Sequence, residues 1–275
     1  MPVSQEMKPF LMPESSEEDV GPLGTEILAL KDRQLRFMRP KAPDRLLDLE
    51  TVAVAHDQDQ YMPYWAALWP VSTYLAQTID RTQWMPPIEG IELGCGLGLP
   101  GLAALAHGIQ MTFTDYDATA LRLVAQSVDL NKLDGARYLH FDWRSLLVTP
   151  LDDRLKPLIN RYDLVLASDL IYEERQVKPL VAAMKLLVKP DGVVFVADQD
   201  RPYREFFLEE ISQAGFVCRK WPVPKKTFGS LDVSGSVYIL TLKESATQPA
   251  GSFQTLSQQK PIRWMIPEDF SLTEG

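Results

Sequence analysis

The stretch Glu92-Leu-Gly94-Cys-Gly96-Leu-Gly98-Leu-Pro-Gly101 decides the fold. It follows the apolar run 88–93, which is typical of a strand, and it leads into 99–107, whose pattern predicts a helix. Glycines at such a junction let the backbone turn sharply and approach a ligand closely. The N-terminus of the following helix then points at that ligand. We interpret the stretch as a nucleotide-type binding loop; the alternative is a turn that merely requires glycine.

On both sides of this loop, from about residue 62 to 243, apolar strand patterns alternate with amphipathic helix patterns. A continuous apolar run such as 193–197 is typical of a strand buried on both faces. Repeated strand–helix units indicate an α/β fold, with a mostly parallel sheet covered by helices on both faces. The last two strands, 216–221 and 236–242, are separated only by a Pro- and Lys-rich loop at 222–230. We therefore expect these two strands to pair antiparallel at the sheet edge.

Three segments lie outside this region. Residues 1–24 are rich in Pro, Ser and Glu and are expected to be flexible. Residues 25–61 are expected to form a β arm, because 26–38 holds two short alternating apolar pairs separated by charges. Residues 244–275 form a polar tail. The apolar residues that can dock this tail onto the body are Trp264, Met265 and Ile266.

Composition narrows the function classes. The chain has 275 residues and a formal net charge of −9, which argues against a duplex-DNA binder. Two cysteines make neither a disulfide framework nor a paired CxxC zinc signature, and the three histidines lack HExxH spacing, so no metal site is expected. No stretch approaches about 18 uninterrupted apolar residues, and the acidic N-terminus lacks the apolar region of a signal peptide. We expect a cytoplasmic protein with no membrane partner.

Ligands of parallel α/β sheets bind beyond the carboxyl ends of the strands, so residues just after each strand are candidates. Asp115 ends the second strand, where a carboxylate can accept both hydroxyls of a ribose, and Tyr116 can pack on the base. Asp142 and Trp143 follow the third strand and suit an adenine amine and its ring. The alternative for these acids is a helix cap or a turn, although Asp117 fits the cap better than Asp115 does.

Two more acids complete the candidate site. Asp169 follows the fourth strand next to Ser168, and Tyr172 stands three residues further on, at the mouth of the predicted cleft. The alternative is a helix cap at Asp169 and core packing for Tyr172. Glu92 precedes the first glycine by two residues, and we expect it to face a cationic amino-acid portion of the ligand.

The loop also matches a dinucleotide pattern. Gly96-Leu-Gly98-Leu-Pro-Gly101 has the form GxGxxG, and Asp115 follows at about the 20-residue spacing of an acid that binds a dinucleotide ribose. Glu92 and the candidate residues after later strands argue against this interpretation. An NAD-dependent or other nucleotide-binding protein stays open at this point.

Taken in order, these motifs resemble a known group. Glu92-Leu-Gly-Cys-Gly-Leu-Gly98 is similar to the first motif of class I, seven-β-strand S-adenosylmethionine-dependent methyltransferases. Asp169-Leu-Ile-Tyr172 resembles the DxxY motif of the protein lysine methyltransferases in that class, methyltransferase family 16. Tyr64-Trp65-Ala-Ala-Leu-Trp69-Pro70 resembles the segment before their core, and Phe141-Asp142-Trp143 is similar to their adenine-side motif. The resemblance covers residues 25–243, and we expect 62–243 to form the methyltransferase domain.

The resemblance implies a three-layer, Rossmann-like, seven-stranded sheet with an antiparallel edge strand. It also implies S-adenosyl-L-methionine as cofactor and the lysine side chain of a protein substrate as methyl acceptor. Asp169 would orient the acceptor amine and balance its charge, while Tyr172 would line the channel or hold Asp169. The cofactor contacts implied in the same way are Trp69, Glu92, Gly94, Gly96, Gly98, Asp115, Tyr116, Asp142, Trp143 and Ser168.

Other functions stay open. One is methyl transfer to a small amine, to arginine or to nucleic acid, and another is a non-catalytic scaffold that keeps the fold. The acidic net charge argues against nucleic acid, and the pair Asp169 and Tyr172 argues against a small-molecule acceptor. The full set of acids argues against loss of catalysis. The sequence predicts no oligomeric state and does not identify the substrate protein.

Overall fold

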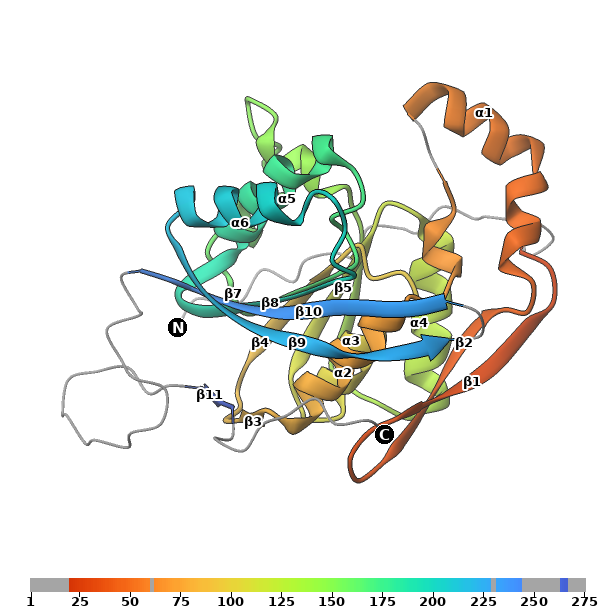
Figure 1. Cartoon of the computed structure of the whole chain (residues 1–275), viewed down its shortest axis with the longest axis horizontal. Helices are drawn as coiled ribbons and strands as arrows, with labels where there is room; N and C mark the ends of the chain where they lie inside the picture. The colour runs from red at the N-terminus through yellow and green to blue at the C-terminus, as the bar shows by residue number, and fades with distance from the viewer. Residues whose placement is uncertain (1–19, 60–61, 229–230, 244–262, 267–275) are drawn as a thin grey trace.

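The computed structural model describes residues 20–59, 62–228, 231–243 and 263–266. Its centre is a seven-stranded sheet (Figure 1). The strands are β4 (Glu89–Leu93), β5 (Gln110–Asp115), β6 (Ala136–His140), β7 (Tyr162–Ser168), β8 (Val188–Asp198), β9 (Phe216–Phe228) and β10 (Leu231–Leu242). Their order is β6-β5-β4-β7-β8-β10-β9, and the strands from β6 to β8 are mutually parallel. The predicted mostly parallel sheet is thereby confirmed.

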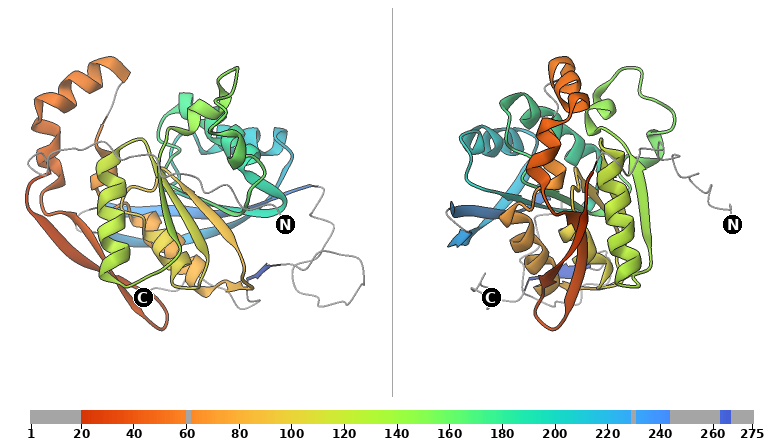
Figure 2. Two further views of the ribbon diagram at one scale, coloured as in Figure 1. Left: turned by 180° about the vertical axis from the view of Figure 1, so that it is seen from behind. Right: turned by 90° about the vertical axis from the view of Figure 1, so that its right-hand side faces the viewer.

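Helices cover both faces of this sheet. The α-helices of the body are α2 (Pro70–Arg81), α3 (Leu99–Leu105), α4 (Ala118–Leu130), α5 (Glu174–Leu187) and α6 (Arg204–Gln213). In β7, Leu164 and Leu166 pack in the same core as α2, α3 and α4, whereas Val165 and Ala167 pack with α5 and α6. Successive side chains of a strand point to opposite faces, so one apolar run supplies both cores. The three-layer α-β-α arrangement follows from this alternation (Figure 2).

The antiparallel strand is β10, which lies between β8 and the edge strand β9. The predicted loop at 222–230 differs from the structure, because β9 continues to Phe228 and that last residue still pairs with Leu231 of β10. Pro222 stands opposite Ser236 in this pairing. An edge strand tolerates proline, since one side of the strand has no neighbour to which an N–H must donate. The prolines of this segment therefore do not mark a loop, because they lie in an edge strand.

The predicted N-terminal hairpin is present as β1 (Leu23–Ala29) and β2 (Gln34–Pro40), which pair antiparallel. It lies along α4, where the Met38 N–H donates to Ser127 Oγ at 2.9 Å. Beyond it the predicted β arm is helical, as a 3₁₀ helix η2 (Pro43–Asp48) and α1 (Glu50–Asp59), which projects from the body (Figure 1). The α1 sequence has no apolar stripe and so no periodicity to detect. The flexible segment predicted at 1–24 falls mostly outside the described residues.

The tail residues dock onto the body as predicted. Strand β11 (Trp264–Met265) pairs antiparallel with β3 (Gln83–Trp84), and the Trp264 ring lies edge-on to Phe195 at 6.1 Å. Arg263 Nη1 donates to the Pro87 carbonyl at 2.7 Å. Within the described ranges, no helix combines the length and the apolar character needed to cross a bilayer.

We expect Trp264→Ala to lower the free energy of unfolding by about 1–2 kcal/mol, because it removes a half-buried ring from the apolar surface around Phe195. The measurement is the thermal unfolding midpoint. Ile27→Ala is the matched control, since Ile27 is 60% exposed and its loss should change stability by less than about 0.5 kcal/mol. Equal midpoints for the two variants would show that the docked strand adds nothing to stability.

Candidate functional site

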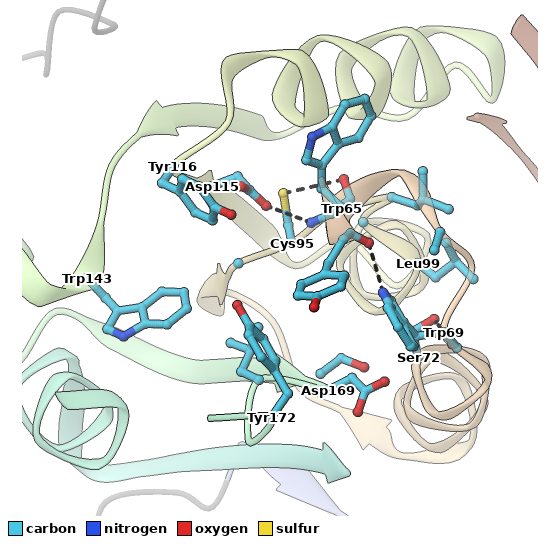
Figure 3. Close-up of a pocket in the computed structure, with 18 of the residues that line it drawn as sticks. Trp65, Trp69, Ser72, Cys95, Leu99, Asp115, Tyr116, Trp143, Asp169 and Tyr172 are labelled. Atoms are coloured by element: carbon cyan, nitrogen blue, oxygen red, sulfur yellow. Dashed lines mark hydrogen bonds between the residues drawn. The ribbon is translucent and has the colours of Figure 1, made fainter. Parts of the chain in front are cut away.

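A cleft opens at the carboxyl ends of β4, β5, β7 and β8. It lies at the topological switch point between β4 and β7, where the strand order reverses. Most residues predicted from the sequence line it (Figure 3). These are Trp69, Gly94, Gly96, Gly98, Asp115, Tyr116, Trp143, Ser168, Asp169 and Tyr172. Glu92 and Asp142 were also predicted and are not among its lining residues. The cleft further includes Tyr64, Cys95, Glu173 and Arg201, which the sequence analysis did not single out as site residues.

The glycine loop needs glycine at each turn. Gly94, Gly96 and Gly98 have φ values of +52°, +51° and +72°, a region that side chains disfavour. A Cβ on Gly94 would lie 2.8 Å from Leu170 Cδ2, and one on Gly98 would lie 2.8 Å from Val124 Cγ2. Backbone rather than side chain therefore forms this wall of the cleft.

Asp115 ties the glycine loop to β5. Its Oδ2 accepts from the Gly96 N–H at 2.9 Å (Figure 3). Its Oδ1 accepts from the Asp117 N–H at 2.9 Å. Burial raises the pKa of Asp115 to about 7, although these hydrogen bonds oppose the shift. Each oxygen can accept a second hydrogen bond, so the carboxylate can still bind a diol. Asp117 caps α4 by accepting from the Thr119 N–H, as expected.

Glu92 does not face the cleft, contrary to our expectation. Ile91 and Leu93 pack with α5 and α6, so strand alternation directs Glu92 to the opposite face, below α3. There Oε2 accepts from the Gly101 N–H at 3.0 Å. Burial raises the pKa of Glu92 well above its ordinary value. Its place is beneath the loop that binds the ligand, and its role as a cofactor contact stays a prediction.

The adenine-side residues separate in the structure. Trp143 is buried in the cleft wall, and its Nε1 has no hydrogen-bond partner. Asp142 instead begins the 3₁₀ helix η4 (Trp143–Leu147), where it accepts from the Arg144 N–H at 2.8 Å and from Arg144 Nε at 2.6 Å. The capping alternative therefore describes the Asp142 carboxylate in this structure, and its contact with adenine stays a prediction. Ser168 Oγ is a second buried polar atom in the cleft without a partner.

Three aromatic side chains surround the mouth of the cleft, and we call them the aromatic collar: Tyr64, Trp69 and Tyr172. Tyr64 belongs to the 3₁₀ helix η3 (Tyr64–Ala66), and its ring meets Trp69 at 6.0 Å and Tyr172 at 5.3 Å, both edge-on. Trp69 Nε1 donates to the Tyr64 carbonyl at 2.9 Å, which fixes the indole (Figure 3). Burial raises the pKa of Tyr172 to about 12, so this phenol is neutral at physiological pH.

Asp169 stands beside the collar in a strained backbone conformation. Its φ is +58°, which is uncommon outside glycine and often marks a functional position. Its Oδ1 accepts from Arg201 Nε at 3.0 Å, and its Oδ2 accepts from Gln199 Nε2. Asp169 therefore has two side-chain donors from the segment after β8. Arg201 lies three residues after the end of β8. Searching for ligand-binding residues just after this strand, as was done for the strand that ends at Asp115, would have found it.

Comparison with known protein families identifies the family to which this chain belongs. A family model described as lysine methyltransferase matches residues 56–214, more than half of the chain. The chain belongs to this family. The strand order and the glycine loop that follows β4 agree with that membership, which also removes the NAD interpretation.

Individual relatives support the assignment. The chain is 32% identical over 113 residues to EEF1A lysine methyltransferase 3 of Mus musculus, covering 40% of this chain and 45% of that protein. It is 30% identical over 112 residues to a histidine protein methyltransferase 1 homolog of Dictyostelium discoideum, covering 40% of this chain and 34% of that protein. The chain thus spans less than half of these two relatives. Pyrococcus horikoshii TYW2, solved with MeSAdo, shares the fold with a TM-score of 0.51, 13% identity and coverage of 78% and 70% of the two chains.

S-adenosylmethionine is the cofactor of this family, and the cleft suits it. The positive-φ glycines leave backbone next to the ligand space, and Asp115 offers free acceptor capacity for ribose hydroxyls. Ser168 Oγ and Trp143 Nε1 are buried polar atoms that a polar ligand could satisfy. The residues that would hold the cofactor are proposed to be the predicted set that lines the cleft.

We expect the affinity for S-adenosylhomocysteine to fall as pH falls below about 7. The pKa of Asp115 is about 7 without ligand, and ribose hydroxyls donate to the carboxylate form, so protonation competes with binding. At pH 6 the dissociation constant should be about tenfold higher than above pH 8. Calorimetric titration at each pH measures it.

Asp115→Asn should bind weakly at every pH and lose this dependence. Asp142→Asn is the matched control and should keep it, because its carboxylate is engaged by Arg144. A dependence that survives in Asp115→Asn would assign the titration to another group.

Proposed function

We propose that this protein transfers a methyl group from S-adenosylmethionine to the side-chain amine of a lysine in a protein substrate. The observation that carries the proposal is the aromatic collar placed beside Asp169 at the mouth of the cleft that holds the glycine loop. Family membership supports methyl transfer, and the mouse relative is named as a lysine methyltransferase. The alternative acceptor is histidine, which the Dictyostelium relative is named for.

The collar suits an extended alkyl chain ending in nitrogen. Aromatic faces exclude water from the methylenes of a lysine and attract the positive charge that develops on nitrogen during transfer. When bound, S-adenosylmethionine supplies the methyl group that the nitrogen must meet in line. Fixing the nitrogen against that group is the main contribution expected of these side chains.

The acceptor nitrogen must present a free electron pair. A free lysine has a pKa of about 10.4, so only about one in 2,500 is neutral at pH 7. Desolvation between aromatic rings lowers this pKa, whereas an unpaired carboxylate would raise it. Asp169 is hydrogen-bonded to Arg201 and Gln199, so its negative charge is already partly balanced. We assign Asp169 to shaping and orienting the acceptor end of the cleft.

We expect Asp169→Asn to reduce methyl transfer at least about 100-fold while the dissociation constant for S-adenosylhomocysteine changes less than about threefold. The assay incubates an extract of the source cells with purified protein and tritium-labelled S-adenosylmethionine. Labelled proteins are separated on a denaturing gel, and acid hydrolysis identifies the methylated amino acid.

A discrete labelled band that yields methyl-lysine supports the proposal. Label in methyl-histidine would replace lysine as the acceptor, and label confined to small molecules or RNA would contradict protein methylation. Lys178→Ala is a surface control that should transfer normally, since its side chain is 66% exposed and lies against Glu210 and Phe206 outside the cleft.

We further propose that residues 62–243 form the methyltransferase domain, flanked by 25–61 and the tail. The pairing of β11 with β3 at the end of the sheet away from the cleft supports a structural role for the tail. A cytoplasmic location is also proposed, since Cys95 and Cys218 are both unpaired, as is usual in a reducing compartment. The net charge of −9 favours a protein over a nucleic acid as substrate.

A further inference from the structure

The segment that follows β8 converges on the acceptor end of the cleft. Arg201 Nε donates to Asp169 Oδ1 at 3.0 Å, and its backbone N–H donates to Asp198 Oδ2 at 3.1 Å. Gln199 Nε2 donates to the other oxygen of Asp169. Of these four residues, only Asp169 belongs to the motifs that carried the resemblance. The arrangement therefore needs an account of its own.

Burial decides which charge of the ion pair meets the cleft. Both side chains line the cleft, but the Asp169 side chain is only 1% exposed, whereas that of Arg201 is 25% exposed. The guanidinium carbon lies 5.4 Å from the centre of the Trp69 ring, so Arg201 packs on the aromatic collar. An incoming nitrogen meets the guanidinium rather than a free carboxylate.

The other charged and titratable groups around Arg201 do not place a free negative charge next to the incoming nitrogen. Asp198 lies 3.9 Å from Arg201 Nε with a fully buried side chain, and it is not a lining residue of the cleft. Glu173 lines the cleft but is engaged by Arg175 Nε at 2.5 Å. The remaining groups are Asp200, which accepts from Arg204, Asp115 under the glycine loop, and the phenols of Tyr64 and Tyr172.

We infer that Arg201 determines the protonation state of the acceptor, because the Asp169–Arg201 pair presents a fixed positive charge that admits an amine in its neutral form and disfavours the ammonium. This inference rests on the proposed function, since it concerns the amine that would be methylated. It adds a specificity-determining residue that lies outside the DxxY pair.

The physical reason is the balance of two opposite effects on the amine. A carboxylate beside a lysine stabilises the ammonium, which has no electron pair to share. A neighbouring cation and a desolvated, aromatic-walled site both favour the neutral amine. The Asp169 carboxylate is buried and hydrogen-bonded to Arg201 and Gln199, while the guanidinium is partly exposed, so both effects favour the neutral amine that must be present before transfer. Asp169 then serves to hold the guanidinium in place.

The test uses n-butylamine, which has the chain and amine of a lysine side chain, bound to full-length protein loaded with S-adenosylhomocysteine. Binding is followed between pH 7 and pH 9 through the indole resonances of the tryptophans. The neutral fraction of an alkylamine with a pKa of about 10.4 grows about 100-fold over this range. We expect the apparent affinity of the wild type to rise at least about tenfold.

Arg201→Met leaves Asp169 free to hold butylammonium, whose fraction hardly changes between these pH values, so its affinity should be flat. Arg201→Lys should keep the rise with pH, because it keeps the charge. The double variant Arg201→Met with Asp169→Asn removes both charges of the pair, so no carboxylate at position 169 is left without its guanidinium, and Asp198 keeps the backbone N–H of residue 201 as a donor. It should fold where the single variant fails, and desolvation alone should restore a rise with pH.

Arg204→Met is the matched control, since Arg204 pairs with Asp200 and Glu205 and does not line the cleft. It should behave as the wild type. A flat affinity in the wild type, or the same rise in Arg201→Met as in the wild type, would overturn the inference. The readout needs no methyl transfer, so it can hold even if no protein in the extract is labelled. Conversely, labelled methyl-lysine with a flat wild-type titration would leave the proposed function standing and remove only the role of Arg201.

Discussion

The buried hydrogen bond from the Gly101 N–H to Glu92 Oε2 is the contact on which the cleft depends. It joins the end of β4 to the first turn of α3 and so fixes the ends of the glycine loop between them. A Cβ on Gly101 would overlap the Phe113 ring and the Glu92 carboxylate, so the contact leaves no room for a side chain. Asp115 then holds the middle of the loop through Gly96. Two buried acids thus shape a loop whose own residues contribute backbone to the cleft.

The two acids differ in what remains for a ligand. Glu92 is enclosed by α3 and serves the protein itself, whereas Asp115 and its spare acceptor positions line the cleft. At the other end of the cleft the same division recurs. Asp169 is enclosed by donors from the segment after β8, while Arg201 keeps an exposed face next to Trp69. In both places a buried carboxylate fixes the group that meets the ligand.

Much of this architecture could be predicted from sequence, because it depends on periodicity and on the rule that ligands lie at strand ends. Asp115, Ser168 and Asp169 were found in that way and line the cleft. Glu92 was misplaced because its position after apolar residues does not reveal which face it takes until both cores are known. Helix α1 was missed because it lacks an apolar stripe, and Tyr64 could not be linked to Tyr172 because their contact depends on tertiary packing.

The position of β10 has a consequence for the order in which the chain can fold. Strand β9 is synthesised first, yet it joins the sheet only through β10, which is inserted between it and β8. During translation β9 therefore has no neighbour to pair with until residues 231–242 have left the ribosome. The edge of β8 with which Val237 and Ile239 later pair stays open until that moment. A nascent chain of this protein thus carries an unpaired sheet edge, which is a target for chaperones and a risk for aggregation, until its last core strand emerges.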